Sequence, residues 1–588
     1  MEITREFPET PAINDIDNNV TLSYQELKHI AEKRKRTFSL LGVKPGDNVA
    51  LILPNGVEFI ASYLALVSLE ALPIIINSKL TSWEISQLFD KCHPDFIITF
   101  SEFYQKHAAL LTPPSPTWQI LLSDKAPSCA PREGVHHLTQ QPDGDAAALT
   151  APHGNPVVAL QFTWRGYARP FPVAHRYLEM TRSTDGLHEH FHPQGVGSVH
   201  LVTLPLYAIF GLSVMLIFPL SVGATLLVTN SLLNRDLAEV LAQHQVTFAC
   251  LVPDVIRYFN GRLAKRKSAP AGLHPQLMIY SGGGHLPAGE AERLSQLLGC
   301  GPVLQGYGLT ESLPIVVQNT RGEQHRGAMG QAIRAAEIRV LGPGGQEVPA
   351  GRIGELVVRG PMIAEGYYQD EEATALFFKD GWLHTGDLVW RDAQGHLFFV
   401  CQRLRISKIR AQMIDLAEIE RVAVRHPQVK RARAWVTRDK HEANVLCLSV
   451  DVSNAQLAQQ ELLTFMGNYL SGFKLPRKID MLPAQGWSMP HEETSRRVLA
   501  VFDFDGTLTH RHTFWRYIRF IHGSAAFWGG MALMLPRIVA VLLKITPLMQ
   551  ARRAFIHHFF AGLSVPGKAR WRAAMCMKNC RAICGRRR

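Results

Sequence analysis

The strand, helix and strand signals near residue 50 constrain the fold of this 588-residue chain most strongly. The run VALILP at 49–54 is apolar, as a buried strand is, and Asn55 and Gly56 then predict a turn. Apolar residues recur at helical spacing over 57–67, and LPIII at 72–76 predicts a second strand. This order predicts a parallel crossover unit. Similar alternation continues to about residue 330, so the sequence predicts an α/β region.

The composition and the predicted secondary structure change at two places along the chain. Residues 112–155 are rich in Pro, Gly, Ser and Ala, which predicts a long surface connection. After about residue 335, AEIRVL and IGELVVRG predict strands separated by a turn, and LFFVCQR follows a hairpin signal. A small α+β region is expected from about 404 to 497. The chain is therefore expected to be a multidomain protein of α/β and α+β parts, since domains typically hold roughly 100–200 residues.

Charge is distributed unevenly. Residues 498–588 hold 15 Lys/Arg and 2 Asp/Glu, whereas the rest holds 47 and 48, so the net charge of +12 comes from the tail. The main body therefore gives no indication of specific nucleic-acid binding. The basic tail is either a contact for RNA or an anionic membrane, or a segment under no ordinary constraint.

Location is predicted from what the sequence lacks. Nine cysteines do not form a disulfide framework at this length, and MEITREFPET has no signal-peptide pattern, so we expect a cytoplasmic protein. No segment reaches the ~20 apolar residues of a membrane span. The nearest, residues 525–543, is interrupted by Pro536 and Arg537, which favours a buried helix pair and leaves membrane-surface association as the alternative.

Three glycine-containing motifs carry the chemistry. In LQGYGLTES (304–312), Gly306 and Gly308 let the backbone approach a ligand, Tyr307 offers an aromatic face, Thr310 a hydroxyl for phosphate and Glu311 a carboxylate for Mg²⁺. YSGGGHLP (280–287) is another glycine-rich turn. GWLHTGDL (381–388) presents an aspartate at position 387 that is suited to two ribose hydroxyls.

In this order the three motifs closely resemble the acyl-adenylating superfamily, which includes acyl-CoA synthetases, nonribosomal-peptide adenylation domains and luciferases. The resemblance covers about 1–497 and extends to LGVKPGDNVALILPN and GELVVRGPMIAEGYY. It implies a large adenylate-forming N-terminal domain (1–400) and a small mobile C-terminal α+β domain (401–497). It also implies that a carboxylate attacks ATP to give acyl-AMP, from which a thiol takes the acyl group.

The resemblance also implies roles and ligands. Tyr307 would stack on adenine beside Gly308, Thr310 would be a catalytic contact to the α-phosphate, Glu311 would be catalytic and hold Mg²⁺, and Asp387 would bind the ribose. Three glycines would border the adenine and acyl pockets: Gly282, Gly283 and Gly284. The implied cofactors are ATP and Mg²⁺. The partners are a small-molecule carboxylic acid, fatty or aromatic, and as thiol acceptor either CoA or the phosphopantetheine of an acyl carrier protein.

Several positions depart from the family pattern. In the phosphate loop FTWRGYARPFPVAH (162–175), Thr163, Gly166 and Pro170 are kept, but Phe171 replaces lysine. Either Arg165 and Arg169 hold pyrophosphate instead, or the loop has lost that role.

Other departures lie towards the C-terminal end. In the hinge, FVCQRLR has Gln402 for arginine and Arg405 for aspartate, and Arg403 would substitute by a one-residue shift in binding the nucleotide. The segment 482–497 contains no lysine, although the family places one there that bridges carboxylate and phosphate. These losses leave an active ligase and an inactive nucleotide- or acyl-binding protein as alternatives.

The tail carries a different motif. VFDFDGTLT (501–509) resembles the first motif of haloacid-dehalogenase-type phosphatases, in which Asp503 would be the nucleophile, Asp505 the general acid/base, and both would bind Mg²⁺. The helical segment that follows resembles a cap. No Asp or Glu occurs from Gly506 to Arg588, so residues 498–588 are expected to be an incomplete Rossmann-like segment. A working phosphatase is a third alternative.

Overall fold

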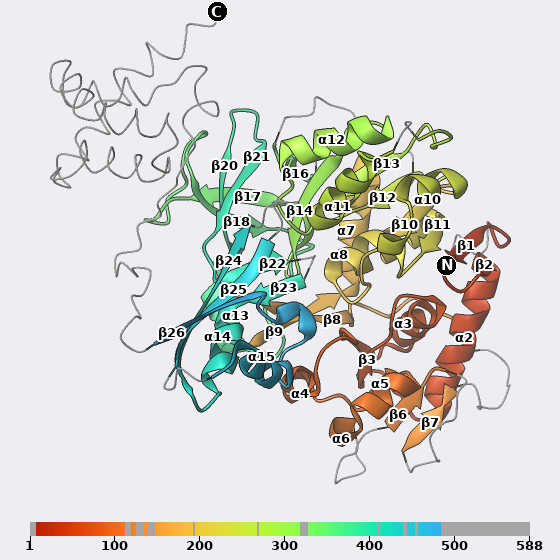
Figure 1. The fold of residues 1–588 in the computed structure, drawn as a ribbon. Coiled ribbons are helices and arrows are strands. Elements are labelled where there is room, and N and C mark those ends of the chain that lie inside the picture. The colour runs from red at the N-terminus through yellow and green to blue at the C-terminus, as the bar shows by residue number, and fades with distance from the viewer. Residues whose placement is uncertain are drawn as a thin grey trace, which may run out of the picture. The chain divides into compact units, whose positions relative to one another are not determined.

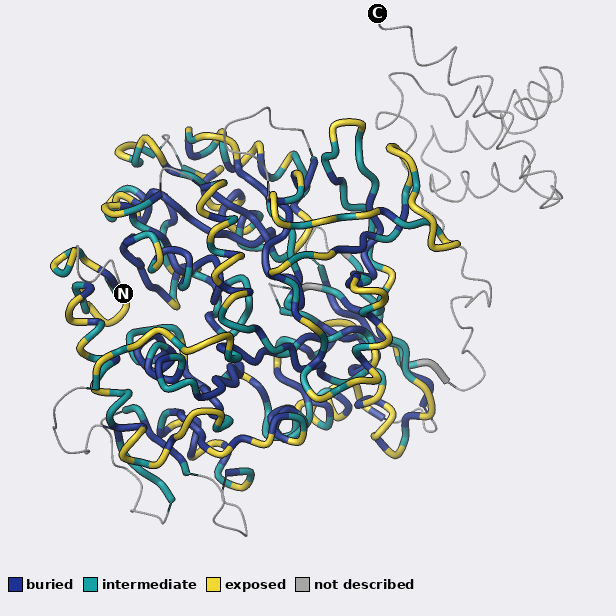
Figure 2. Tube along the Cα trace, turned by 180° about the vertical axis from the view of Figure 1, so that it is seen from behind, coloured by how far each residue is buried: buried dark blue, intermediate teal, exposed yellow. Residues whose placement is uncertain are grey.

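The computed structural model describes residues 7–483, except 112–118, 125–133, 139–146, 192–193, 267–269, 318–326, 410–411, 439–443 and 453–456. All described residues belong to one compact unit, Met1–Trp487. Figure 1 shows its elements, and in Figure 2 the buried stretches of the chain gather in the interior while exposed stretches lie on the outside.

The first large sheet has seven strands and contains the predicted crossover unit. In spatial order its strands are β7 (Val135–His137), β6 (Gln119–Leu122), β5 (Phe96–Thr99), β3 (Asn48–Leu51), β4 (Leu72–Ile75), β8 (Val157–Trp164) and β9 (Pro170–Arg176). All neighbours are parallel except the hairpin of β8 and β9. Helix α3 (Val57–Leu69) joins β3 to β4. The predicted strand–helix–strand unit is confirmed.

The second large sheet has nine strands. In spatial order they are β16 (Gln331–Ala332), β15 (Leu313–Val317), β14 (Leu304–Leu309), β13 (Met278–Ser281), β12 (Phe248–Cys250), β10 (Val199–Val202), β11 (Thr225–Val228), β1 (Pro11–Asp15) and β2 (Val20–Ser23). One hydrophobic core includes residues of both sheets, such as Leu51 of β3 and Val228 of β11. The two large sheets therefore share one close-packed core.

Two capping boxes fix helices around these sheets. Ser23 and Glu26 cap α2 (Tyr24–Leu40), and Thr81 and Glu84 cap α4 (Ser82–Cys92). Each pair satisfies two backbone N–H groups that a helix start leaves without partners. The start of α4 is thus fixed where it meets the C-terminal part of the chain.

A five-stranded sheet follows, as the strand signals after residue 335 predict. Its strands are β17 (Glu337–Leu341), β18 (Gly354–Arg359), β20 (Trp382–Arg391), β19 (Phe378–Lys379) and β21 (Leu397–Gln402). Strand β21 pairs with β20 in the predicted hairpin. Since β21 ends at Gln402, this sheet extends just beyond the expected domain boundary at residue 400.

The last described part is a small α+β region. It contains the hairpin of β22 (Ile406–Ile409) and β23 (Gln412–Asp415), helices α14 (Leu416–Val424) and α15 (Gln459–Gly467), and the sheet of β24 (Val429–Arg438), β25 (Asn444–Val452) and β26 (Lys478–Pro483). Its buried residues form a separate hydrophobic cluster, from Ile414 to Ile479.

One expectation is wrong in part. Residues 112–155 are not only a surface connection, because β6 and β7 belong to the seven-stranded sheet and Leu121 and Leu122 of β6 are fully buried. The strand is only four residues long and lies in a segment rich in Pro, Gly and Ser, so the composition of the whole segment concealed it.

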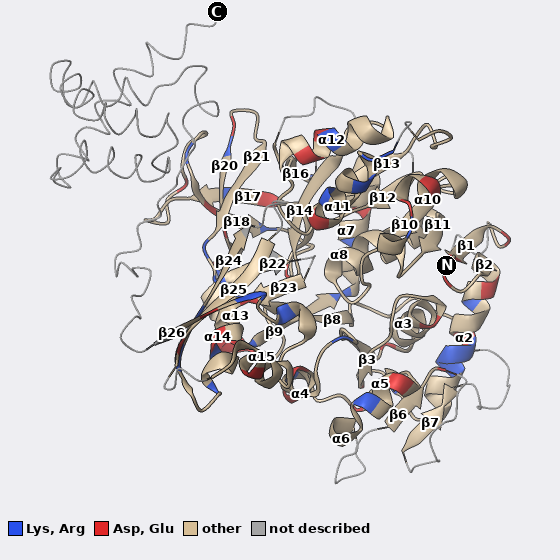
Figure 3. Ribbon diagram, in the orientation of Figure 1, with Lys and Arg blue, Asp and Glu red and all other residues tan. Residues whose placement is uncertain are grey.

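The charged residues of the described part do not separate into regions of one sign. Lys/Arg and Asp/Glu are interspersed along its ribbon (Figure 3). Among the described residues, no helix combines the length and apolar content that crossing a membrane requires. The basic tail, with its segment 525–543, lies outside the described residues.

Candidate functional site

Two cavities meet at strand β14, which carries most of the LQGYGLTES motif. The first, which we call the polar cavity, is lined by Asp254, Arg257 and Asp387 among others and has a volume of about 500 Å³. The second, which we call the apolar cavity, is lined by residues such as Leu204, Ile209 and Phe210 and has a volume of about 180 Å³. They share the lining residues Val252, Gly283, Gly306, Tyr307, Gly308, Leu309 and Gln402. The two cavities therefore lie side by side along β14.

The polar cavity contains a hydrogen-bonded pair from two sheets. Tyr307 of β14 donates its hydroxyl to Oδ2 of Asp387 on β20, at 2.7 Å. Burial and the neighbouring Asp387 raise the pKa of Tyr307 well above its ordinary value, so the phenol stays a neutral donor. The predicted adenine and ribose residues thus line one cavity and fix each other's positions.

Glycine is required in β14 for steric reasons. A Cβ atom on Gly306 would lie 1.5 Å from the hydroxyl oxygen of Tyr280, and one on Gly308 would lie 2.3 Å from the carbonyl oxygen of Leu313. Three further predicted glycines follow β13 and divide between the cavities: Gly282 lines the apolar one, Gly284 the polar one and Gly283 both. All three predicted glycine motifs are therefore brought to the same place.

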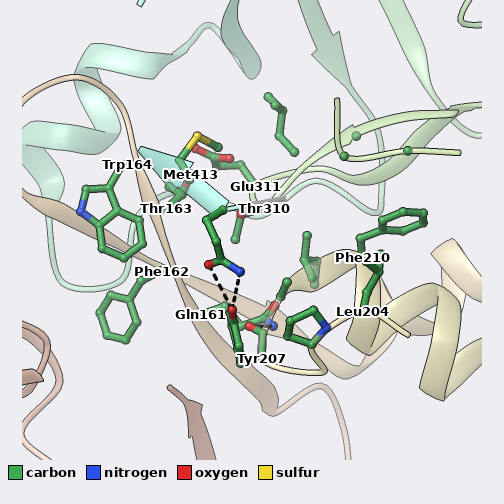
Figure 4. Close-up of a pocket in the computed structure, with 18 of the residues that line it drawn as sticks. Gln161, Phe162, Thr163, Trp164, Leu204, Tyr207, Phe210, Thr310, Glu311 and Met413 are labelled. Atoms are coloured by element: carbon green, nitrogen blue, oxygen red, sulfur yellow. Dashed lines mark hydrogen bonds between the residues drawn. The ribbon is translucent and has the colours of Figure 1, made fainter. Parts of the chain in front are cut away.

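The apolar cavity ends in polar groups. Figure 4 shows Phe210, Leu204 and Tyr207 on one side and Thr310, Glu311 and Met413 on another. The predicted residues Thr163, Arg165, Thr310 and Glu311 all line it. The carbonyl of Thr310 accepts a hydrogen bond from Nε2 of buried His175, at 2.6 Å, which holds the backbone at Thr310 in place.

A glutamine network crosses this cavity. Gln161 of β8 donates from Nε2 to the carbonyl of Tyr207 (2.8 Å), whereas the hydroxyl of Tyr207 lies 2.7 Å from Nε2 of Gln412. The dashed lines in Figure 4 mark these hydrogen bonds. Gln412 lies on β23, so the C-terminal region contributes to the cavity wall. Sequence reasoning missed Gln161 and Gln412, because neither lies in a recognised motif.

Arg165 and Glu311 lie together at the polar end. Nη1 of Arg165 is 3.6 Å from Oε1 of Glu311, which also accepts a 2.7 Å hydrogen bond from the hydroxyl of Tyr367. Arg165 donates from Nη2 to the carbonyl of His384 (2.7 Å), and its guanidinium covers the ring of Phe377 at 4.3 Å. The exposed fractions of the Arg165 and Glu311 side chains are only 2% and 1%.

The contact of Arg165 with Glu311 makes this carboxylate a poor ligand for Mg²⁺. A divalent cation beside this carboxylate would lie within a few ångström of a guanidinium whose charge is not screened by water. The residues as they stand do not fit the predicted metal.

The remaining loop and hinge predictions fall outside both cavity linings. Arg169 pairs with Asp370 at 2.5 Å. Gly166 lies against the hinge: a Cβ there would be 2.9 Å from the backbone nitrogen of Arg405. Arg403 pairs with Glu355 at 2.9 Å and is half exposed. The structure therefore brings Arg165, and not the other two arginines, to the site.

A buried lysine near the site was also missed. Lys474 lines the apolar cavity, with Nζ 2.7 Å from Glu84 of α4 and 2.8 Å from Glu418 of α14. No local sequence signal predicts this triad, because its three members are far apart in the chain. Asp503 and Asp505 lie outside the described residues.

The chain is similar to known AMP-binding enzymes over most of its length. The family model described as AMP-binding enzyme matches residues 2–368. A 4-coumarate–CoA ligase from Pinus taeda is 26% identical over 500 residues, which cover 82% of this chain and 90% of that protein. A long-chain-fatty-acid–CoA ligase from Escherichia coli O6:H1 is 27% identical over 492 residues, covering 76% and 85%.

Solved structures show the same fold. A mutant o-succinylbenzoate CoA synthetase from Bacillus subtilis, bound to a product analogue, aligns with a TM-score of 0.71 and 23% identity, over 82% of this chain and 94% of that one. The fold and site define an adenylate-forming protein of mixed α/β architecture. The chain belongs to the AMP-binding enzyme family. The expectation of an ATP-dependent acid–thiol ligase is confirmed at the level of the family.

Proposed function

We propose that this chain joins a carboxylic acid to the AMP part of ATP and then passes the acyl group to the thiol of CoA. The observation that carries the proposal is the wall that the two cavities share, Gly306 to Leu309. Thr310 directly follows that wall. Adenosine in the polar cavity and the acyl group in the apolar one would bring the carboxylate and the α-phosphate together near Thr310.

Some residues of the site would bind the nucleotide, and others would stabilise the charge that develops on the phosphate. Asp387 would accept hydrogen bonds from the ribose hydroxyls while Tyr307 supports it, and the hydroxyl of Thr310 would donate to a phosphate oxygen. Groups that are held in place before the reaction stabilise developing charge without a reorganisation cost. The water-poor walls of the apolar cavity would protect the reactive mixed anhydride from hydrolysis.

The size of the apolar cavity favours a compact acid. A dry cavity of about 150 Å³ holds a benzene ring, and the apolar cavity has about 180 Å³. We therefore propose that aromatic or short- to medium-chain acids are preferred to long-chain fatty acids.

CoA is the proposed acceptor. It is the acceptor named in the two curated relatives, a 4-coumarate–CoA ligase and a long-chain-fatty-acid–CoA ligase. The phosphopantetheine of an acyl carrier protein is the alternative, and a transfer assay with both thiols distinguishes them.

A second candidate function is nucleotide binding without efficient adenylation. It is favoured by the buried contact of Arg165 with Glu311, which leaves this carboxylate unsuited to a divalent metal. In that case ATP or AMP binds and no acyl-CoA forms.

The domain division is proposed as 1–400, 401–497 and 498–588. The separate hydrophobic cluster of the α+β region supports an independent small domain, which we propose moves between the two half-reactions. Residues 498–588 are proposed to be the remnant of a phosphatase domain, so ending the chain after Arg497 should leave nucleotide binding unchanged.

The test is to incubate the protein with ATP, Mg²⁺, CoA and a graded panel of aromatic and straight-chain acids, and to detect acyl-CoA by mass spectrometry. Acyl-CoA from one-ring aromatic acids, with less from long chains, would support the proposal. Nucleotide binding without any acyl-CoA or acyl-AMP would favour the second candidate.

A further inference from the structure

We propose that Arg165 is the resident cation of the nucleotide site: its guanidinium bridges Glu311 and the nucleotide phosphate, so that AMP binds here without a divalent metal. The inference rests on the proposed function, because it concerns the same site. It is argued from two observations. Arg165 and Glu311 are in contact, and the buried guanidinium occupies the place beside this carboxylate where Mg²⁺ was predicted.

The position of Arg165 is determined by the fold. It follows the last residue of β8 and is held by the carbonyl of His384 on β20 and by the ring of Phe377. The side chain is almost completely enclosed. A buried arginine is stable only when its charge is compensated, and Glu311 is the carboxylate that lies next to it.

Each partner keeps one buried atom without a hydrogen bond. Within the described residues, Nε of Arg165 and Oε2 of Glu311 have no partner. Both residues line the apolar cavity, near the predicted position of the α-phosphate. Buried polar atoms are rarely left without a partner in native proteins, so the Nε–H of Arg165 indicates that a ligand with an acceptor oxygen completes the site. Oε2 of Glu311 can only accept, so it is not a contact for a phosphate oxygen. An N–H donor on a cation suits a phosphate oxygen.

The chemistry of guanidinium supports the assignment. It carries a permanent charge and several N–H donors in one plane, so it can contact a carboxylate and a phosphate at the same time. A carboxylate-bound metal would have the same bridging role. The metal would, however, have to displace Arg165 from contacts that the surrounding sheet and helix residues fix.

The test is calorimetric titration with AMP and with adenosine, each in EDTA and in millimolar Mg²⁺. The wild type should bind AMP equally well, within about twofold, in the two buffers. Arg165→Met should weaken AMP binding about 10- to 100-fold, the scale of one hydrogen bond to a charged group, and leave adenosine binding unchanged. Glu311→Gln should not weaken AMP binding in either buffer. Arg34→Met is the matched control. It removes another Arg–Glu pair, in which Nε of Arg34 lies 2.7 Å from Oε1 of Glu58, and neither residue lines the two cavities.

Two results would overturn the inference. One is AMP binding by the wild type that is at least tenfold tighter in Mg²⁺ than in EDTA. The other is an Arg165→Met protein that binds AMP as the wild type does. A Mg²⁺ effect that disappears in Glu311→Gln would assign the carboxylate to a metal instead.

A second measurement needs no nucleotide and therefore separates the inference from the proposed function. Denaturant unfolding of wild type, Arg165→Met, Glu311→Gln and the double variant measures the coupling of the two side chains. We expect Arg165→Met to lower the unfolding midpoint and the added Glu311→Gln to restore part of it. Additive effects would contradict the pairing. Coupling without any binding of AMP or ATP would instead contradict the proposed function.

Discussion

The hydroxyl of Tyr307 lies 2.7 Å from Oδ2 of Asp387, although the two residues are 80 positions apart in the chain. This contact joins β14 of the nine-stranded sheet to β20 of the five-stranded sheet, and it lies in the polar cavity. The proposed nucleotide site thus lies between two sheets, and its geometry depends on how they pack.

Asp387→Ala should abolish most of the increase in melting temperature that ATP or AMP causes. The variant loses the proposed ribose acceptor and the support of Tyr307, and ligand stabilisation falls with affinity by mass action. Asp392→Ala, in the turn of the same hairpin and outside both cavity linings, should keep the increase. A full shift in Asp387→Ala would show that the nucleotide binds elsewhere.

Gly306→Ala should strongly destabilise the protein, because its Cβ would lie 1.5 Å from the hydroxyl oxygen of Tyr280, which is buried. Overpacking of this kind costs about 1–3 kcal/mol or more. Gly261→Ala is the control: Gly261 lies within α11 (Pro253–Leu263) with open space at its Cβ position, so alanine should stabilise by about 0.5–1 kcal/mol. Denaturant unfolding checks both, and similar midpoints for the two variants would contradict the steric argument.

Much of the fold could be predicted because its signals are local. The strands β3 and β4 are short apolar runs, and a glycine-rich turn follows β13. The predicted positions of Tyr307 and Asp387 in one site came from a family resemblance in motif order. The contact of Arg165 with Glu311 could not be predicted, since it depends on the packing of the β8–β9 hairpin against other elements. The same holds for Lys474 with Glu84 and Glu418, which come from three separate elements.

Phe210→Ala should shift acid preference towards longer chains. Phe210 lines the apolar cavity and lies against Gly282, where a Cβ would be 3.0 Å from the phenyl ring. Removing the ring enlarges a cavity of about 180 Å³. The ratio of kcat/KM for a long-chain acid to that for a one-ring aromatic acid should rise about 10-fold, the scale of a few methylene groups. An unchanged ratio would place the acyl group elsewhere.

Stability in acid should depend on Asp17. Its carboxylate accepts hydrogen bonds from Thr229, Asn230, Ser231 and Arg235. Burial opposes the charge, but these bonds lower the pKa from 3.8 to about 2. A lowered folded-state pKa gives stability that is present above pH 3.8 and lost as the pH falls towards 2. Asp17→Asn should therefore be less stable at neutral pH, and its difference from wild type should shrink below pH 4. A pH-independent difference in unfolding free energy would contradict this.

The most direct test of the central claim is acid-dependent exchange of labelled pyrophosphate into ATP. The measurement follows adenylation alone and needs no thiol acceptor. With a one-ring aromatic acid, the wild type should exchange label above the acid-free background, and Asp387→Ala should fall to that background. Exchange at the background level across aromatic and fatty acids, by a protein that binds ATP, would contradict acid activation.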